Sequence, residues 1–324
     1  MCYTIGMAKR EITTLIEAVR YFSDPDVCLA YLVEQRWPDG KVICPTCGSQ
    51  EVHFIATRRV WRCKVKHERQ QFSIKIGTIF EDSPLGFDKW LPAIWLITSA
   101  KNGISSYELH RSLGVSQKSA WFMLHRIRLA MRTNSFEKMS GQVEVDETFI
   151  GGKARFIHQS DRARKITGTG GSGKAAVMGL LERNSPERHS VVRAKVVENV
   201  RRKTLAPEVR ANVSAGVELF TDALASYSDL DADYIHQVIN HAVSYVEGNV
   251  HTNGLENFWS LLKRSLRGTY ISVEPFHLFR YLDEQALRFN TREDGDGERF
   301  EKVLGQVSGR RLTYRDLTGQ TINC

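Results

Sequence analysis

The chain has 324 residues, of which 42% are hydrophobic and 25% charged, and its formal net charge is +8. This composition excludes collagen-like, coiled-coil and disordered chains. The length suits two or three globular domains. Its longest apolar run, residues 90–100, contains Pro92 and is shorter than the ~20 residues that cross a bilayer. Residues 1–20 lack the apolar core of a signal peptide, so we expect a cytoplasmic protein with no membrane partner.

The positive charge is concentrated in the first part of the chain. Residues 1–140 carry 20 Lys and Arg against 13 Asp and Glu, whereas residues 141–324 carry 25 against 24. A local positive excess is typical of a module that binds a polyanion, because contacts to phosphates release counterions. A solvated surface rich in Lys and Arg would have the same composition, so charge alone leaves both interpretations open.

Four residues near the N-terminus have the spacing of metal ligands. Cys44 and Cys47 lie on a Cys-Pro-Thr-Cys-Gly turn, and Cys63 and His67 follow after a short interval. These soft and borderline ligands predict one structural Zn²⁺ in a zinc ribbon. The alternative is that Cys63 is a half-buried strand residue and His67 a surface residue. Three further cysteines are too scattered for a disulfide framework: Cys2, Cys28 and Cys324.

The segments around these ligands favour three short strands, at residues 52–55, 59–62 and 71–74. Such a small sheet buries little apolar surface, so the metal is expected to supply its folding energy. Residues 58–75 contain seven basic residues and one acidic residue, which makes a basic hairpin a predicted DNA contact. Its predicted contact residues are Arg58, Arg59, Arg62, Lys64 and Lys66.

Two helices joined by a short turn are predicted at residues 105–128, after an apolar helix at residues 87–99. Ser105 and Glu108 have the spacing of a capping box, and Ser116 can cap the second helix. The pattern fits a helix-turn-helix segment whose second helix reads DNA with its N-terminal end. An ordinary helical hairpin gives much the same pattern. The predicted DNA contacts here are Gln117, Lys118 and Arg126.

Residues 141–222 have the order of three strands, a helix and a fourth strand. On the first strand, valines alternate with Glu144 and Asp146, so one face is apolar and the other is acidic. The fourth strand ends in Asp222. This order, with an acid on the first and last strands, is that of a ribonuclease H-like α/β sheet. A basic loop at residues 153–174, between the first two strands, is expected to cross DNA.

A third acid, Glu256, lies on the polar face of a predicted amphipathic helix that starts near Asn253. Apolar residues repeat at helical spacing from Leu255 onward. A metal-binding carboxylate beside cations is what phosphodiester chemistry requires. Each of the three acids, taken alone, also fits a structural role as a helix cap or a surface strand residue. The cations that follow Glu256 are Lys263, Arg264 and Arg267.

Together these motifs resemble the DDE-type transposases of prokaryotic insertion sequences, in the group with an N-terminal zinc ribbon. The resemblance runs from about residue 31 to about residue 290. The motifs that carry it are CPTCGS from Cys44, the Cys63/His67 pair, GTIF at 77–80, EVDETFIGG at 144–152, Thr221-Asp222, HTNGLENFWSLLKR at 251–264 and RFN at 288–290.

The resulting organisation has five parts. They are an N-terminal helical segment at residues 1–30, a zinc ribbon at 31–82, a helical connector with the helix-turn-helix segment at 83–135, a ribonuclease H-like catalytic domain at 141–290 and a C-terminal tail at 291–324.

The resemblance implies a nucleoid-associated transposase that binds the terminal inverted repeats of an insertion sequence, cleaves DNA and transfers the strand into target DNA. It implies two Mg²⁺ (or Mn²⁺) ions, with Asp146 bridging both, Asp222 on one and Glu256 on the other. A homodimer or higher oligomer is expected, since two ends must be joined. Two alternatives stay open: a zinc-ribbon regulator with an inactive catalytic domain, and a nuclease that cuts without joining.

Overall fold

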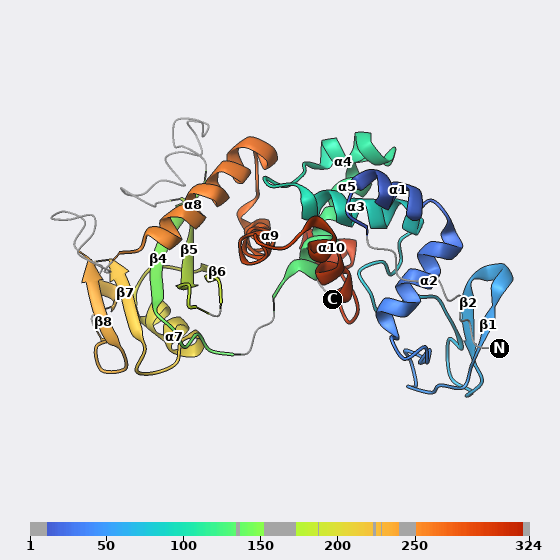
Figure 1. Ribbon diagram of the computed structural model, residues 1–324, viewed down its shortest axis with the longest axis horizontal. Coiled ribbons are helices and arrows are strands. Elements are labelled where there is room, and N and C mark those ends of the chain that lie inside the picture. The colour runs from blue at the N-terminus through green and yellow to red at the C-terminus, as the bar shows by residue number, and fades with distance from the viewer. Residues whose placement is uncertain are drawn as a thin grey trace. The chain divides into compact units, whose positions relative to one another are not determined.

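The structure is a computed structural model that describes residues 12–133, 137–151, 173–186, 188–222, 225–227, 229–239 and 251–319. The chain divides into two compact units (Figure 1): unit 1 is Met1–Met131 with Glu293–Cys324, and unit 2 is Arg132–Arg292. Residues 1–11, Cys324 and the predicted basic loop up to residue 172 lie outside the described residues. None of the helices formed by the described residues has the length and hydrophobicity of a membrane span.

Unit 1 begins with two helices whose first turns are capped by side chains. α1 (Leu15–Tyr21) starts after Thr14, which forms a capping box, and α2 (Pro25–Arg36) starts after Asp24, whose carboxylate accepts two backbone N–H groups. Proline as the first residue of α2 sacrifices no helical hydrogen bond, because the N–H at that position would have no partner inside the helix.

A three-stranded antiparallel sheet follows, in the order β1–β2–β3. Its strands are β1 (Val52–Ile55), β2 (Val60–Cys63) and β3 (Gln71–Phe72), which confirm the three predicted strands to within two residues. Trp61 stacks on Phe72 across the sheet, with ring centroids 5.9 Å apart. Its strands contain only two to four residues each, so the sheet is expected to depend on a bound metal for its folding energy.

Three helices continue unit 1: α3 (Phe87–Ser99), α4 (Ser106–Leu113) and α5 (Gln117–Met131). The capping box predicted at Ser105 is present at the start of α4. Gly114 ends α4 with φ of 66°, a left-handed conformation that glycine adopts at little steric cost. The predicted pair of helices and its tight turn are therefore confirmed.

The C-terminal segment folds back into unit 1. α10 (Asp296–Gly305) packs against α3, and α11 (Tyr314–Thr318) ends the described chain. The Phe300 ring is 1% exposed and its centroid lies 5.4 Å from that of Trp95. Residues 293–319 thus complete the core of unit 1.

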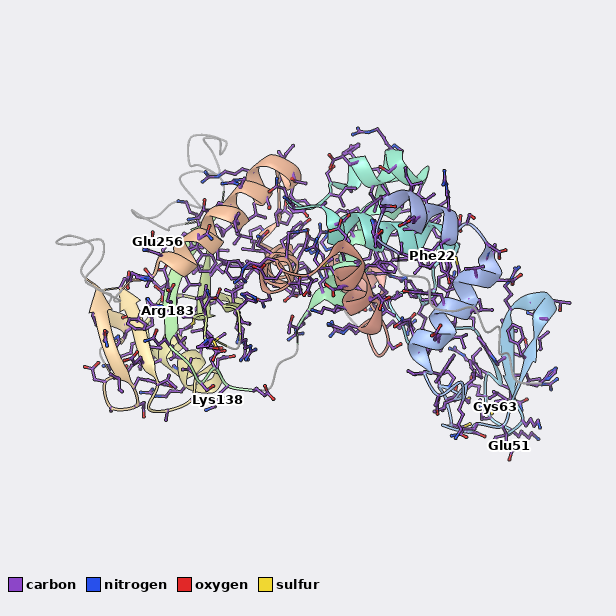
Figure 2. All side chains as sticks on the ribbon, viewed as in Figure 1. Phe22, Glu51, Cys63, Lys138, Arg183 and Glu256 are labelled. Carbon is purple, nitrogen blue, oxygen red and sulfur yellow. The ribbon has the colours of Figure 1, made fainter. Side chains whose placement is uncertain are left out.

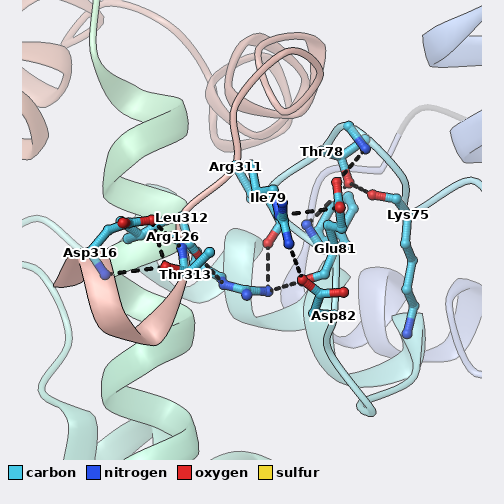
Figure 3. Close-up of polar contacts among 12 residues, drawn as sticks. Lys75, Thr78, Ile79, Glu81, Asp82, Arg126, Arg311, Leu312, Thr313 and Asp316 are labelled. Atoms are coloured by element: carbon cyan, nitrogen blue, oxygen red, sulfur yellow. Dashed lines mark hydrogen bonds and ion pairs between the residues drawn. The ribbon is translucent and has the colours of Figure 1, made fainter. Parts of the chain in front are cut away.

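Arg126 joins the C-terminal segment to the loop before α3 (Figure 3). Its guanidinium donates to the carbonyl oxygens of Leu312 at 3.0 Å, Ile79 at 3.0 Å and Glu81 at 2.7 Å. Arg311 pairs with the Glu81 carboxylate at 3.2 Å. Because Arg126 is only 3% exposed, the structure places this predicted DNA contact inside unit 1, where it holds three backbone segments together.

Unit 2 contains a five-stranded mixed sheet in the order β6–β5–β4–β7–β8. β4, β5 and β6 are antiparallel neighbours, β7 runs parallel to β4, and β8 runs parallel to β7. Four of the strands are those predicted, and β8 was not. The strands are β4 (Val143–Ile150), β5 (Ala175–Glu182), β6 (Val191–Val197), β7 (Glu218–Asp222) and β8 (Ile235–Ile239).

Helices cover both faces of this sheet (Figure 1). α7 (Arg202–Asn212) shares one apolar core with Val143 and Val145 of β4. α8 (Asn253–Ser265) and α9 (Leu278–Asn290) share a second core on the opposite face. The acids that alternate with the two valines lie on the face opposite them, as the period of two predicted, and α8 covers this face.

Asn290, in the RFN motif, pairs with the edge strand β6. Its side-chain amide donates to the Val192 carbonyl at 3.0 Å and accepts the Val192 N–H at 2.7 Å. The side chain thereby acts as a one-residue strand partner and covers part of an otherwise open sheet edge.

Candidate active site and metal centre

The predicted zinc ligands lie together in unit 1. Cys44 Sγ lies 3.4 Å from His67 Nε2. Cys47 Sγ lies 3.6 Å from Cys63 Sγ, and all four donor atoms are within 4.8 Å of one another. Ligand atoms around a tetrahedral zinc ion are about 3.5–3.8 Å apart, so this set fits one Zn²⁺.

The imidazole of His67 is oriented for metal binding by its other nitrogen. Nδ1 lies 2.7 Å from the carbonyl oxygen of Glu68. An N–H at Nδ1 donating to that oxygen leaves Nε2 unprotonated and free to bind zinc. This geometry favours a zinc site over the alternative in which Cys63 and His67 are unrelated.

The cations of the ribbon differ in their surroundings. Arg58 and Arg62 are exposed; Arg62 pairs with Gln71 in the β2–β3 register, and Arg58 donates to the Gln71 side chain at 3.2 Å. Arg59 instead forms an exposed ion pair with Asp26 of α2 at 2.5 Å, so its guanidinium is already paired. Two more exposed cations follow β2: Lys64 and Lys66.

The N-terminal end of α5 is capped and partly exposed. Ser116 Oγ accepts the N–H of Ser119 at 3.1 Å, as predicted. Gln117 is half-buried and donates to Ser106 Oγ of α4 at 2.9 Å. Lys118 is exposed and its Nζ lies 4.8 Å from the ring centroid of Tyr314. Of the three contacts predicted for this segment, Lys118 alone is fully at the surface.

Asp146 and Asp222 come together in unit 2 because their strands are parallel neighbours. The register pairs Val145 with Thr221, and the two aspartates are the next residues on each strand. One oxygen from each, together with one from Glu147, lies within 4.8 Å of the others. Glu147 lies within the sequence motif at residues 144–152 but was not among the predicted site residues, and a strict alternation along β4 would place it on the face opposite Asp146.

Glu256, the predicted third carboxylate, lies outside this cluster of three. It is exposed in the first turn of α8 (Figure 2). The helix that carries it packs on the same sheet face as Asp146, which accepts a hydrogen bond from Trp259 of α8, and its charge contributes to raising the pKa of Asp146.

Burial and mutual repulsion raise the pKa values of these acids. Burial raises the pKa of Asp146 to about 6, with the charges of Asp222 and Glu256 adding to the increase and a hydrogen bond from Trp259 opposing it. Burial, and then the charges of the two aspartates, raise the pKa of Glu147 to about 9. Glu147 Oε1 is buried and has no hydrogen-bond partner among the described residues. Crowded carboxylates with an unsatisfied oxygen fit a divalent cation, which would relieve both costs.

We expect protein without added divalent metal to lose stability as the pH rises from 5 to 8. Folded Asp146 and Glu147 hold protons more tightly than the unfolded chain does, so unfolding becomes easier as pH rises through the interval between the unfolded and folded pKa values. The melting temperature should fall by a few degrees, and Glu147→Gln should flatten this slope. Thermal unfolding of the zinc-loaded chain at each pH tests this; an unchanged slope in Glu147→Gln would contradict it.

Glu144 ties β4 to the start of α8. Its side chain is 1% exposed, and it accepts Arg183 Nε at 2.8 Å and the backbone N–H of Leu255 at 3.0 Å. A Cβ atom at Gly254 would lie 2.8 Å from Glu144 Oε2, so glycine permits this close approach. Glu144 is therefore a structural acid that holds the helix carrying Glu256.

Arg183→Met is expected to lower the free energy of unfolding of unit 2 by about 3 kcal/mol, because it leaves the buried Glu144 carboxylate without its cation. Arg188→Met is the matched control. Arg188 is 60% exposed and lies 3.6 Å from Glu182, and surface pairs contribute about 1 kcal/mol or less. Urea unfolding compares the two variants, and equal effects would argue against the role given to Glu144.

Cations follow Glu256 along α8 and along the π-helical turn Leu266–Tyr270 that continues it. Lys263 is half-buried, and burial and the neighbouring Arg267 lower its pKa while the charge of Asp146 opposes the shift. Arg264 and Arg267 are exposed. The same helix thus presents Glu256 in its first turn and positive charge toward its end.

Fold and site together define a zinc-ribbon protein with a cluster of carboxylates on a mixed α/β sheet, a cluster compatible with a divalent metal. Residues 138–290 match the ISXO2-like transposase domain, and residues 23–65 match the transposase zinc-ribbon domain. The chain therefore belongs to the insertion-sequence transposases that carry a zinc ribbon.

Two similar proteins agree with this assignment. An uncharacterized transposase-like protein of Haemophilus influenzae is 36% identical over 99 residues, which are 30% of this chain and 80% of that protein. An uncharacterized protein in transposable element ISH50 of Halobacterium salinarum is 29% identical over 267 residues, which are 79% of this chain and 88% of that protein. No solved structure matches the chain.

Proposed function

We propose that this transposase cuts DNA at the ends of an insertion sequence and joins the freed ends to target DNA. The observation that carries the proposal is the meeting of Asp146 and Asp222 at adjacent parallel strands, with carboxylate oxygens within 4.8 Å. Paired carboxylates on a rigid sheet are suited to metal-assisted phosphodiester chemistry.

We assign unit 2 to the ribonuclease H-like fold. Three antiparallel strands followed by two parallel ones, with helices on both faces, support this assignment. The first strand carries Asp146, and β7, its parallel neighbour, ends in Asp222. The fold thereby accounts for two acids that are far apart in the sequence.

The metal ligands in this proposal are Asp146, Asp222 and Glu256, with Glu147 as a further oxygen donor. Hard carboxylate oxygens suit Mg²⁺ or Mn²⁺. When bound, the metal would lower the pKa of an attacking hydroxyl group and neutralise charge on the leaving oxygen. The two glutamates differ in exposure: Glu147 is half-buried with a buried Oε1, whereas Glu256 is exposed.

The chain's own cations are expected to hold the DNA phosphates beside these acids. Lys263 and Arg264 follow Glu256 on α8, and Arg267 lies on the π-helical turn Leu266–Tyr270 that continues α8. This segment can therefore contact the DNA backbone beside the scissile phosphate. Removing one such cation should weaken binding with little dependence on sequence and reduce its salt dependence.

Recognition of the inverted repeats is assigned to unit 1. We interpret α4 and α5 as a helix-turn-helix whose second helix presents Lys118, with the half-buried Gln117 beside it. The exposed ribbon cations Arg58, Arg62, Lys64 and Lys66 would contact the adjacent phosphates. Arg126, which is buried, and Arg59, which is paired with Asp26, are not in this set.

A joining assay tests the proposal. Purified full-length protein is incubated with a labelled inverted-repeat end, a target plasmid and Mg²⁺. Cleaved ends joined to the plasmid support a transposase, cut ends without joining indicate a nuclease, and binding without cutting indicates a regulator. Two ends joined in one event would further indicate a dimer or higher oligomer. Comparing Glu147→Gln with Glu256→Gln shows which acid the reaction requires.

A further inference from the structure

The indole of Trp259 contacts the central aspartate of the candidate site. Trp259 Nε1 donates to Asp146 Oδ2 at 2.8 Å. The tryptophan lies on α8, one turn after Glu256, and is only 4% exposed. An N–H donor held in a core gives the carboxylate it binds a fixed direction.

This contact is possible because the neighbouring strand β5 carries a glycine at the contact point. The β4–β5 register places Gly179 directly beside Asp146. A Cβ atom at Gly179 would lie 2.6 Å from Trp259 Cζ2 and 2.8 Å from Leu255 Cδ2. Only glycine therefore lets α8 lie close enough to the sheet for the indole to reach the aspartate.

The surroundings keep the indole in place. Trp259 belongs to the core that α8 and α9 form with the sheet. The start of α8 is fixed separately, since Glu144 accepts the Leu255 N–H at 3.0 Å. A helix attached to β4 at two points has little freedom to move its donor. An ionised carboxylate has about four acceptor positions, so one N–H leaves Asp146 able to bind metal.

We propose that Trp259 is a positioning residue that orients the Asp146 carboxylate for the divalent metal. In this proposal, the role of Gly179 is to leave space for the indole ring of Trp259. The inference rests on the proposed metal-dependent function. Groups that hydrogen-bond to metal ligands fix ligand orientation, and their loss lowers metal affinity by about 10–100-fold. Loss of the indole N–H should have an effect of that size without removing a ligand.

Binding of Mn²⁺ to the full-length, zinc-loaded protein tests this without DNA. The signal of free Mn²⁺ in electron paramagnetic resonance gives the affinity directly. Trp259→Phe, which keeps an aromatic ring but no N–H, is expected to bind Mn²⁺ about 10–100-fold more weakly than the wild type. Trp95→Phe is the matched control, because Trp95 is a 1% exposed tryptophan of α3 in unit 1.

Two further variants separate orientation from folding. Replacing Trp259 by β-(3-benzothienyl)alanine keeps the bicyclic shape and substitutes sulfur for the N–H, so it should weaken Mn²⁺ binding as Trp259→Phe does. Gly179→Ala should also weaken it by displacing the ring. Wild-type affinity in the benzothienyl variant would overturn the inference. If the wild type bound no Mn²⁺, or Asp146→Asn bound it equally well, the proposed function itself would fail.

Discussion

Asp146→Asn is expected to abolish DNA cleavage and strand transfer while leaving binding to inverted-repeat DNA unchanged. Asparagine keeps the shape of the side chain but removes the charge that a divalent metal requires, at the point where β4 and β7 bring two aspartates together. The loss of rate should be on the order of 10³-fold or more, as for removal of other central catalytic groups. Binding should persist because we assign it to unit 1 and to the cations of α8.

The control for this experiment is another aspartate of unit 2. The Asp233 side chain is 40% exposed and pairs at 2.7 Å with Arg210 of α7, the helix on the sheet face opposite Asp146, so Asp233→Asn should cut and join at the wild-type rate. Cleavage is measured on a labelled inverted-repeat end and binding by gel shift at a fixed salt concentration, since affinity for DNA depends on salt. Strand transfer by Asp146→Asn at the wild-type rate would falsify the assignment of the active site.

The second large effect is expected from loss of the zinc ligand Cys63. Cys63→Ser should release the zinc and unfold the ribbon, because structural zinc supplies on the order of 10 kcal/mol to small domains of this kind. The cysteine ends β2 and its Sγ lies 3.6 Å from that of Cys47. Without the metal, the exposed cations of the ribbon lose their common scaffold, and binding to inverted-repeat DNA should fall.

Cys28→Ser is the matched control for the zinc experiment. Cys28 is also buried, but it lies on α2 and donates to the Phe22 carbonyl at 3.2 Å, a contact that serine can replace. Zinc content by elemental analysis and DNA binding by gel shift are compared between the two variants. One zinc per chain and full binding in Cys63→Ser would refute the ligand assignment.

Features that depend on residues close together in sequence were predicted well. The capping box at Ser105 and the Cys44/Cys47 turn each rest on two residues within one turn of chain, so spacing alone specifies them. The alternation along β4 is also local, and it correctly placed Asp146 on the face opposite Val143 and Val145. Asp222 was found because its strand ends in an acid.

Features that depend on distant contacts could not be read from the sequence. A surface arginine and a buried one look alike on a helix, and Arg126 is buried because carbonyls such as that of Leu312 reach it from the other end of the chain. Glu144 resembled Asp146 by position, but Arg183 and the α8 backbone make it structural. Glu147 joins the carboxylate cluster only because the strands meet as they do, which alternation along one strand does not reveal.

The return of residues 293–319 to unit 1 has a consequence for how the protein is made. Phe300 and Leu312 supply contacts to Trp95 and Arg126, so a ribosome must synthesise all of unit 2 before unit 1 can be completed. Truncated copies of the element that end before residue 293 should therefore produce chains that fold poorly and do not compete for the inverted repeats. Only a protein that already carries its catalytic half would then occupy the DNA ends.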